Sequence, residues 1–534
     1  MTTKNIFKGL AVAVCFSTML SACTAKFEDY NTNKHEATEE MMENDNLKTG
    51  ALFRQIQRAV FFFRDGTYLD SDYQVMNNLL ADTYAGYFAP TLAANNGVHC
   101  GSYFMTEGWR RAMFVNKYTY AMNAWQKLAK TATDLEQAEV LALANIMKVA
   151  TMHQVTDYYG PVPYSKVGLS LNAEYDSQED IYNQFFEELG DAIDVLNAFK
   201  NGNPGVTLMA QYDYVYGGNV ESWIKFANSL RLRLAMRVVY ADPALAQEQA
   251  ELSVNDQTGV ITAAAERPVL PSSLVNHHPV YEINVNFNDG DCQMAASMDV
   301  FLNGYNDPRG TIYFKKAADD KLHGVRNGVH ASNWANYRNA AGKVSAPNSL
   351  SQAYSITWLH ASEVAFLRAE GALRGWNMGG TAQEFYEKGI KLSFEEMGAG
   401  DATAYIANAT AKPADFKDNV SSNSMTALTD VTIAWEADAN FERSLEKIMT
   451  QKWLAIFPNG CEAWAEYRRT GYPQLLPVVN NDSQGVVNTN LQIRRVPFPH
   501  DEYTNNAAGV ATGVAKLNGL DNAGTKLWWD KKPR

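Results

Sequence analysis

Apolar residues recur every three or four positions along much of the chain, which is the spacing of one buried helix face. The pattern is clear in residues 361–374, which predict a helix that begins near His360 or Ser362. Arg374 and Gly375 supply the basic last turn and the glycine stop of such a helix. The apolar positions of this segment are Ala365, Phe366, Ala369, Ala372 and Leu373.

A second helix is predicted directly after the turn at Gly379 and Gly380. Thr381 is suited to be its N-cap, because Glu384 follows three residues later and the two can form a capping box. Two amphipathic helices on so short a loop pack against each other, and their outer faces need further helices. The second apolar stripe consists of Ala382, Phe385, Tyr386, Gly389, Ile390, Phe394 and Met397.

The same periodicity predicts helices over 47–63, 116–129, 135–153, 181–199 and 222–240. In the last of these, the apolar stripe is Trp223, Phe226, Ala227, Leu230 and Leu234, and we expect Lys225, Arg233 and Arg237 to lie off it. The fold class is therefore mostly α, a scaffold of helical pairs.

The amino-terminal residues predict an export signal rather than part of the fold. Residues 1–22 combine two lysines with a short apolar core, and Leu20-Ser21-Ala22-Cys23 resembles the bacterial lipobox. Cleavage would leave Cys23 as the lipidated first residue, with residues 23–46 as a polar tether and 47–534 as the folded domain. Several acyl chains anchor a protein stably, at about 0.8 kcal/mol per buried CH₂. A plain secretory peptide with an incidental cysteine is the alternative.

Charge and cysteine content narrow the class of protein. The net charge of −13 argues against a nucleic-acid partner, which needs a basic patch. When Cys15 of the signal peptide and the lipidated Cys23 are set aside, Cys100, Cys292 and Cys461 remain. They are odd in number and widely spaced, so a hydrophobic core rather than a disulfide framework must stabilise the fold.

Three long polar and aromatic insertions interrupt the helices at 64–111, 272–305 and 323–354, and a fourth at 400–436 is rich in Ala, Thr, Asn and Asp and is expected to be a surface excursion. Loops on a rigid scaffold often carry binding sites. Aromatic faces pack on sugar C–H groups while amides and charged groups meet the hydroxyls, although the same mixture suits peptides. The candidate ligand-binding residues are Tyr84, Tyr87, Asn95, Asn96, Trp109, Asp289, Asp291, Trp334, Tyr337 and Arg338.

Each candidate also has a structural interpretation. Burial beneath the scaffold fits Tyr84 and Tyr87 as well as ligand contact does. Trp334 and Tyr337 have no apolar stripe to join, which favours ligand contact. Trp376, Trp453 and Trp464 are expected in the core, and Asp307 and Arg309 are expected to pair within a turn.

Enzyme signatures are lacking: the chain has no H-E-x-x-H, G-x-S-x-G, P-loop or G-x-G-x-x-G motif. No cofactor is expected. Residues 286–291 match a Ca²⁺ loop only in part, so a structural Ca²⁺ has weak support. Because the chain has 59 acidic residues, a carboxylate pair at glycosidase spacing is inevitable. An all-helical surface glycoside hydrolase is therefore the alternative to a binding protein.

A series of segments in the same order along the chain resembles the SusD/RagB family of nutrient-binding outer-membrane lipoproteins of Bacteroidetes. They are FEDYNTN (27–33), TDYYGPVPYSKVG (156–168), ANSLRLRLAMRVVYADP (227–243), NDPRG (306–310), ASEVAFLRAEGALRGWNMGG (361–380), KIMTQKWLAIFPNGCEAWAEYRRTGYP (447–473) and RRVPFPHDEY (494–503).

The resemblance implies a tetratricopeptide-like scaffold with the ligand site among the insertions. It also implies an outward-facing protein on the outer membrane and a partner, a SusC-like TonB-dependent transporter over which the protein sits as a lid. The acidic residues after Cys23 resemble a surface-export signal and agree with this location. The expected ligand is an oligosaccharide or, as for some members of the family, a peptide.

Overall fold

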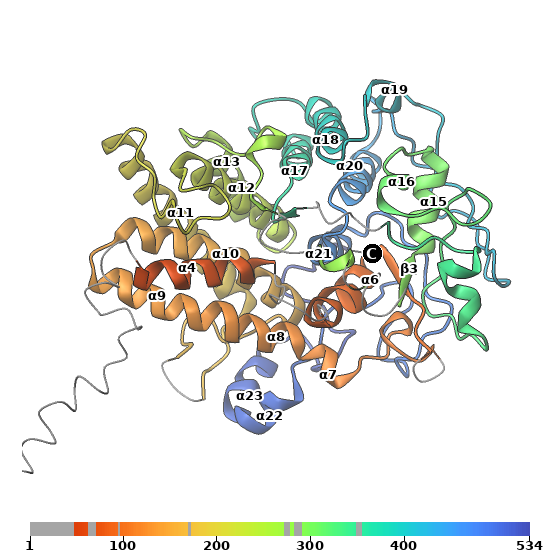
Figure 1. The fold of residues 1–534 in the computed structure, drawn as a ribbon, viewed down its shortest axis with the longest axis horizontal. Helices are drawn as coiled ribbons and strands as arrows, with labels where there is room; N and C mark the ends of the chain where they lie inside the picture. Colours follow the sequence, from red (N-terminus) through yellow and green to blue (C-terminus); the bar gives the residue numbers. More distant parts are fainter. Residues whose placement is uncertain are drawn as a thin grey trace, which may run out of the picture. The chain divides into compact units, whose positions relative to one another are not determined.

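Helices dominate the structure, a computed structural model that describes residues 47–61, 71–93, 97–168, 172–271, 278–281, 283, 291–348 and 355–533. The chain divides into two units, Met1–Ala51 and Leu52–Arg534. The described part of the first unit is the beginning of the first helix in Figure 1, α4 (Leu47–Val60), and the remaining elements belong to the second unit.

The predicted helices are present, with ends that differ from the predicted ones by a few residues. The segment predicted as 116–129 forms one run of α8, the π-helical η5 and α9, which is followed by the long α10. Neighbours in sequence pack together, as α10 with α11, α11 with α12, and α12 with α13. The long helices are α8 (Ala112–Lys117), η5 (Tyr118–Met122), α9 (Asn123–Asp134), α10 (Ala138–Tyr159), α11 (Gln178–Gly202), α12 (Val220–Val238), α13 (Pro243–Asn255), α17 (Ala361–Leu373), α18 (Ala382–Met397), α20 (Phe441–Ala455) and α21 (Gly460–Thr470).

Short elements connect this scaffold, and the described strands form two small antiparallel pairs. In the first pair Phe88 lies opposite Met294, and in the second Val269 lies opposite Thr357. The strands are β1 (Phe88–Pro90) with β3 (Cys292–Met294) and β2 (Val269–Leu270) with β4 (Ile356–Thr357). The short helices are α5 (Ser71–Tyr73), η2 (Gln74–Ala81), α6 (Asp82–Tyr84), η4 (Cys100–Ser102), α7 (Glu107–Arg110), η6 (Ala264–Glu266), α14 (Pro279–Tyr281), α15 (Ala296–Tyr305), α16 (Gly310–Tyr313), η9 (Trp334–Tyr337), η10 (Asn339–Ala341), α19 (Thr403–Ile406), α22 (His500–Asn505) and α23 (Ala507–Ala515).

The helical hairpin of α17 and α18 confirms the local signals in the sequence. His360 is the N-cap of α17, and Thr381 forms the predicted capping box with Glu384 at the start of α18. The two helices approach closely where Gly389 lies under the ring of Phe366, because a Cβ at Gly389 would come within 2.7 Å of that ring. Both helices also pack against α20, beside which they lie in Figure 1.

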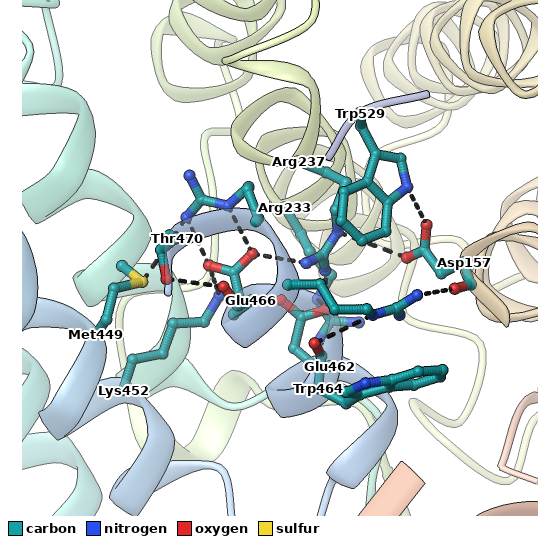
Figure 2. Close-up of polar contacts among 12 residues, drawn as sticks. Asp157, Arg233, Arg237, Met449, Lys452, Glu462, Trp464, Glu466, Thr470 and Trp529 are labelled. Carbon is teal, nitrogen blue, oxygen red and sulfur yellow. Dashed lines mark hydrogen bonds and ion pairs between the residues drawn. The ribbon is translucent and has the colours of Figure 1, made fainter. Parts of the chain in front are cut away.

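A buried network of charged side chains joins the helices at the centre of the scaffold (Figure 2). Arg237 donates to Glu466 Oε1 at 2.7 Å and to Glu462 Oε2 at 2.5 Å, and Lys452 Nζ lies 3.1 Å from Glu466 Oε2. Arg233 makes a bidentate pair with Glu363. The expectation that Arg233 and Arg237 lie off the buried face was therefore wrong: both are buried, and carboxylates from α17 and α21 neutralise them.

The described part of the chain also tests several other local predictions. Arg309 and Asp307 form the expected pair, with Nη2 and Oδ2 2.6 Å apart. Trp453 and Trp464 are core residues as predicted, whereas Trp376 is only half-buried. Residues 400–436, expected to be a surface excursion, have many exposed residues but bury Phe416, Val431 and Ile433. In the described ranges, no helix is both long and apolar enough to cross a membrane.

Candidate ligand-binding site

A small hydrophobic cluster, separate from the main core, forms where three of the insertions meet. It consists of Ala89 from the first insertion, Ala295 from the second, and Val325, Val329, Tyr337 and Val344 from the third. The half-buried Trp334 packs against this small cluster. Residues as distant in the sequence as Ala89 and Val344 therefore belong to one cluster, against which a single aromatic side chain packs.

Close approach of the backbone at Gly97 and contacts with neighbouring aromatic rings hold Trp334 in place. A Cβ at Gly97 would lie 2.8 Å from Trp334 Cζ2, and Gly97 has a φ of +95°, which favours glycine. The rings of His99 and Tyr337 have centroids 6.3 and 5.6 Å from that of Trp334. Asn333 caps η9 by accepting a hydrogen bond from the Ala335 N–H at 3.1 Å. The indole is thus positioned before any ligand arrives.

A polar edge formed by Asp291 and Arg338 borders the aromatic residues. Arg338 Nη2 lies 3.3 Å from Asp291 Oδ1, and Gln74 Nε2 donates to Asp291 Oδ2 at 3.3 Å. Burial raises the pKa of Asp291, and the Arg338 guanidinium opposes that rise. Asn336, between Trp334 and Arg338 in the sequence, is partly exposed and adds a side-chain amide. The edge therefore offers both donors and acceptors.

His330 and Asp482 extend the polar edge, and sequence reasoning missed both. His330 Nε2 lies 2.8 Å from Asp482 Oδ2, and the Asp482 N–H donates to the Ser102 carbonyl at 2.7 Å. The segment that carries Asp482 lies beside residues 327–328. Two backbone hydrogen bonds join the segments, from Val479 N–H to Asn327 O and from Asn480 N–H to Gly328 O. No local pattern at Asp482 indicated this, because its partners are distant in the sequence.

Two buried ring N–H groups at the site have no hydrogen-bond partner in the described part of the chain. One is Trp334 Nε1 and the other is His99 Nε2. His99 Nδ1 accepts from the Gly101 N–H at 3.1 Å, so in the neutral ring the proton is on Nε2. Burial and the nearby His330 lower the pKa of His99 to about 4, so the ring is neutral at pH 7. A buried unpaired donor costs about 1–3 kcal/mol. Other buried groups in the described part of the chain, such as Trp358 Nε1, also lack a partner, so this feature alone does not mark a binding site.

Comparison with known proteins identifies the family. The family model for "SusD-like: Susd and RagB outer membrane lipoprotein" matches residues 29–530. The chain belongs to the SusD-like family. No curated protein matches it.

Solved structures of SusD homologues agree with the family assignment. A chitin-binding SusD homologue from Flavobacterium johnsoniae is 38% identical, with a TM-score of 0.86 over 90% of this chain and 98% of its own. A SusD homologue from Bacteroides vulgatus is 34% identical, with a TM-score of 0.85 over 91% of this chain and 99% of its own. Another from Bacteroides uniformis is 36% identical, with a TM-score of 0.83 and the same coverages. The predicted SusD-like, mostly α fold is confirmed.

In this SusD-like protein, the residues proposed from the sequence fall into distinct environments. Asp291, Trp334, Tyr337 and Arg338 come together as described above, although the Tyr337 ring is largely covered, at 5% exposure. Trp109 lies in α7, is half-buried, and packs on the main core rather than on the small cluster. Asn95, Asn96, Asp289 and the lipidation residue Cys23 lie outside the described residues.

Tyr84 and Tyr87 of the SusD-like chain are core residues, which corrects the expectation that they face a ligand. Tyr87 is fully buried, and its hydroxyl donates to the Trp453 carbonyl at 2.6 Å. The Tyr84 ring packs against that of Trp464, with centroids 5.3 Å apart. The physical reason is that 71–84, inside the first insertion, forms α5, η2 and α6; η2 and α6 pack against α21, and the chain that follows carries Tyr87 against Trp453 and Phe457.

Proposed function

We propose that this SusD-like protein binds a glycan at the site around Trp334 and delivers it to a SusC-like TonB-dependent transporter in the outer membrane. The observation that supports this most directly is the 38% identity, over 90% of the chain, to a SusD homologue described as chitin-binding. The family consists of outer membrane lipoproteins, which agrees with an extracellular nutrient as ligand.

The geometry around Trp334 fits a sugar. The indole is a large flat apolar surface, and sugar C–H groups pack on such surfaces. Arg338 and Asn336, which are close to Trp334 in the sequence, and the His330–Asp482 pair supply groups that can meet hydroxyls. Because Gly97 and the small cluster already hold the ring, little side-chain entropy is lost on binding.

Calorimetric titration with chito-oligosaccharides tests the binding role. Trp334→Ala should weaken binding about ten-fold or more, because an aromatic anchor contributes roughly 1–3 kcal/mol. Trp435→Ala is the matched control: Trp435 is also half-buried, but it packs on Tyr386 in the main core. Normal affinity in Trp334→Ala, or an equal loss in both variants, would show that the site lies elsewhere. Binding of peptides but not glycans would change the ligand class.

Delivery and the absence of catalysis need separate tests. In the native host, cross-linking at the cell surface should recover a TonB-dependent barrel with this protein, and deletion of its gene should slow growth on the bound glycan. The purified protein should leave oligosaccharides and peptides uncleaved over long incubation. Turnover that disappears on substitution of a single carboxylate would instead establish a glycoside hydrolase.

A further inference from the structure

A shallow hollow of about 490 Å³ opens at the ends of four scaffold helices, distant in sequence from the insertions. It lies where α12 passes into α13, where α17 ends and where α20 begins. We call it the aromatic hollow and define it by five of its residues, Tyr240, Gln247, Arg374, Trp376 and Phe441. Its volume falls within the roughly 300–1,000 Å³ of small-ligand pockets.

Arg374 is held rigidly at this hollow by a buried carboxylate. Its Nε and Nη2 donate to Glu370 Oε1 at 3.0 and 2.7 Å, and Nη2 also donates to the Tyr240 hydroxyl at 3.0 Å. The guanidinium carbon lies 4.9 Å from the Tyr240 ring centroid and 5.1 Å from that of Phe441. Nη1 of Arg374 has no hydrogen bond to any described residue. The guanidinium group is therefore fixed by its other two nitrogens, while Nη1 can donate to a ligand.

Glu370 also connects the aromatic hollow to the central charge network. Arg469 donates to Glu370 Oε1 at 2.8 Å, the oxygen that Arg374 also contacts, and to Oε2 at 2.6 Å. Burial alone would raise the pKa of Glu370, but Arg469 and Arg374 outweigh it and lower that pKa. The carboxylate is therefore ionised at neutral pH, and its charge is shared between Arg374 and Arg469. The hollow consequently presents hydrogen-bonding groups rather than a strong positive field.

Trp376 supplies an aromatic surface that is not already stacked. It follows Gly375 just after α17, is half-buried, and has neither a ring nor a cation stacked on it in the described ranges. Its indole N–H has no hydrogen-bond partner there either. Gln247 donates to Glu251 Oε1 at 2.9 Å, which leaves its own carbonyl oxygen as an acceptor. An aromatic face, two kinds of N–H donor and an amide acceptor therefore line one hollow.

We propose that the aromatic hollow is a second glycan-binding site, in which a sugar ring lies on Trp376 and its hydroxyls meet Arg374 Nη1 and Gln247 Oε1. The proposal takes its ligand class from the proposed function, but the hollow shares no lining residue with the site around Trp334. A neutral ligand with alternating donors and acceptors fits these groups better than an anion does. Two sites on one protein would raise retention on a polymer through avidity.

Fluorine NMR of the full chain labelled with 5-fluorotryptophan tests both sites at once. The chain has 11 tryptophans, and Trp→Phe substitutions would assign the resonances of Trp334, Trp376 and Trp435. The probes are chitohexaose, cellohexaose, maltohexaose and xylohexaose, with a proline-rich peptide as the alternative ligand. We expect one hexasaccharide to shift the signals of Trp334 and Trp376 with different midpoints while that of Trp435 stays constant.

The pattern of shifts distinguishes the second site from the first. A shift of the Trp334 signal alone would overturn the second site and leave the proposed function intact. A shift of the Trp376 signal alone would support the aromatic hollow and overturn the proposed site around Trp334. No shift with any hexasaccharide, or a shift of Trp376 with the peptide only, would overturn the second glycan site. An equal shift of Trp435 would show a non-specific effect and also overturn it. In the supporting case, Trp376→Ala should weaken the second titration about ten-fold, and Trp435→Ala should not.

Discussion

Replacement of Glu466 by glutamine would reveal how strongly the buried charge network stabilises the scaffold. Glu466 accepts hydrogen bonds from Arg237 Nη1 at 2.7 Å and Arg469 Nε at 2.9 Å, and it lies 3.1 Å from Lys452 Nζ (Figure 2). Glutamine has nearly the same shape but no charge. Three buried cations would therefore share fewer counter-charges, and one amide N–H₂ would be placed against them.

The expected loss is large because the network is out of contact with water. Removal of one partner from a buried ion pair costs about 3–5 kcal/mol, since the remaining charge stays buried without compensation. Burial alone would raise the pKa of Glu466, but Arg469, Lys452 and Arg237 hold it well below its ordinary value of 4.5. The stabilisation is therefore complete at pH values above 4.5 and is lost as the pH falls from there toward the folded-state pKa.

Urea unfolding followed by circular dichroism, at pH 7 and at several values below 4.5, measures this contribution. Asp134→Asn is the control for a carboxylate-to-amide change, because Asp134 pairs with Lys130 where the two side chains are 58% and 75% exposed. Such an exposed pair is worth less than about 1 kcal/mol. The reasoning fails if Glu466→Gln costs no more than Asp134→Asn. It also fails if the difference between wild type and Glu466→Gln does not narrow in acid.

Three further substitutions test the site, the core and the anchor. Gly97→Ala should lower glycan affinity, because its Cβ would displace the Trp334 ring. It should also cost ~1–2 kcal/mol of stability, because the φ of residue 97 is strained for alanine. An unchanged affinity in a calorimetric titration would contradict the first expectation. Trp464→Ala should cost ~3–5 kcal/mol in a melting experiment, with binding by the folded protein retained, since the ring is fully buried between Tyr84 and Tyr158. Cys23→Ala should move the protein from the membrane to the soluble fraction; a wild-type protein with no lipid by mass spectrometry would end the lipoprotein hypothesis.

Local signals predicted the helical scaffold well because the interactions behind them are local. The Thr381 capping box joins residues three positions apart, and the contact of Phe366 with Gly389 joins two helices that are consecutive in the chain. The burial of Arg237 was not predictable in this way. Its partner Glu466 is 229 residues away in the chain, so a charged position that looks solvent-exposed on one helix becomes central when another helix covers it.

The candidate site could be located only in part for a related reason. Composition marked the insertions that carry Trp334 and Arg338; the structure packs Trp334 on the small cluster and pairs Arg338 with Asp291, and ligand contact by these residues stays a prediction. Composition does not distinguish a ring that lies under the scaffold from one that lies on it, so Tyr87 looked equally suitable. His330 and Asp482 escaped notice because single polar residues carry no periodic signal, and only the tertiary fold makes them neighbours.

The small hydrophobic cluster beneath Trp334 has a consequence for how such proteins change their ligands. These residues form a core of their own. A change of side-chain volume at Val325, Val329 or Val344 can therefore be compensated within the small cluster, without repacking of the helix pairs. The insertions can then be transplanted or randomised as a cassette while the scaffold continues to fold. Libraries that diversify residues 323–348 on an unchanged helical frame are the natural starting point for building receptors of new sugar specificity.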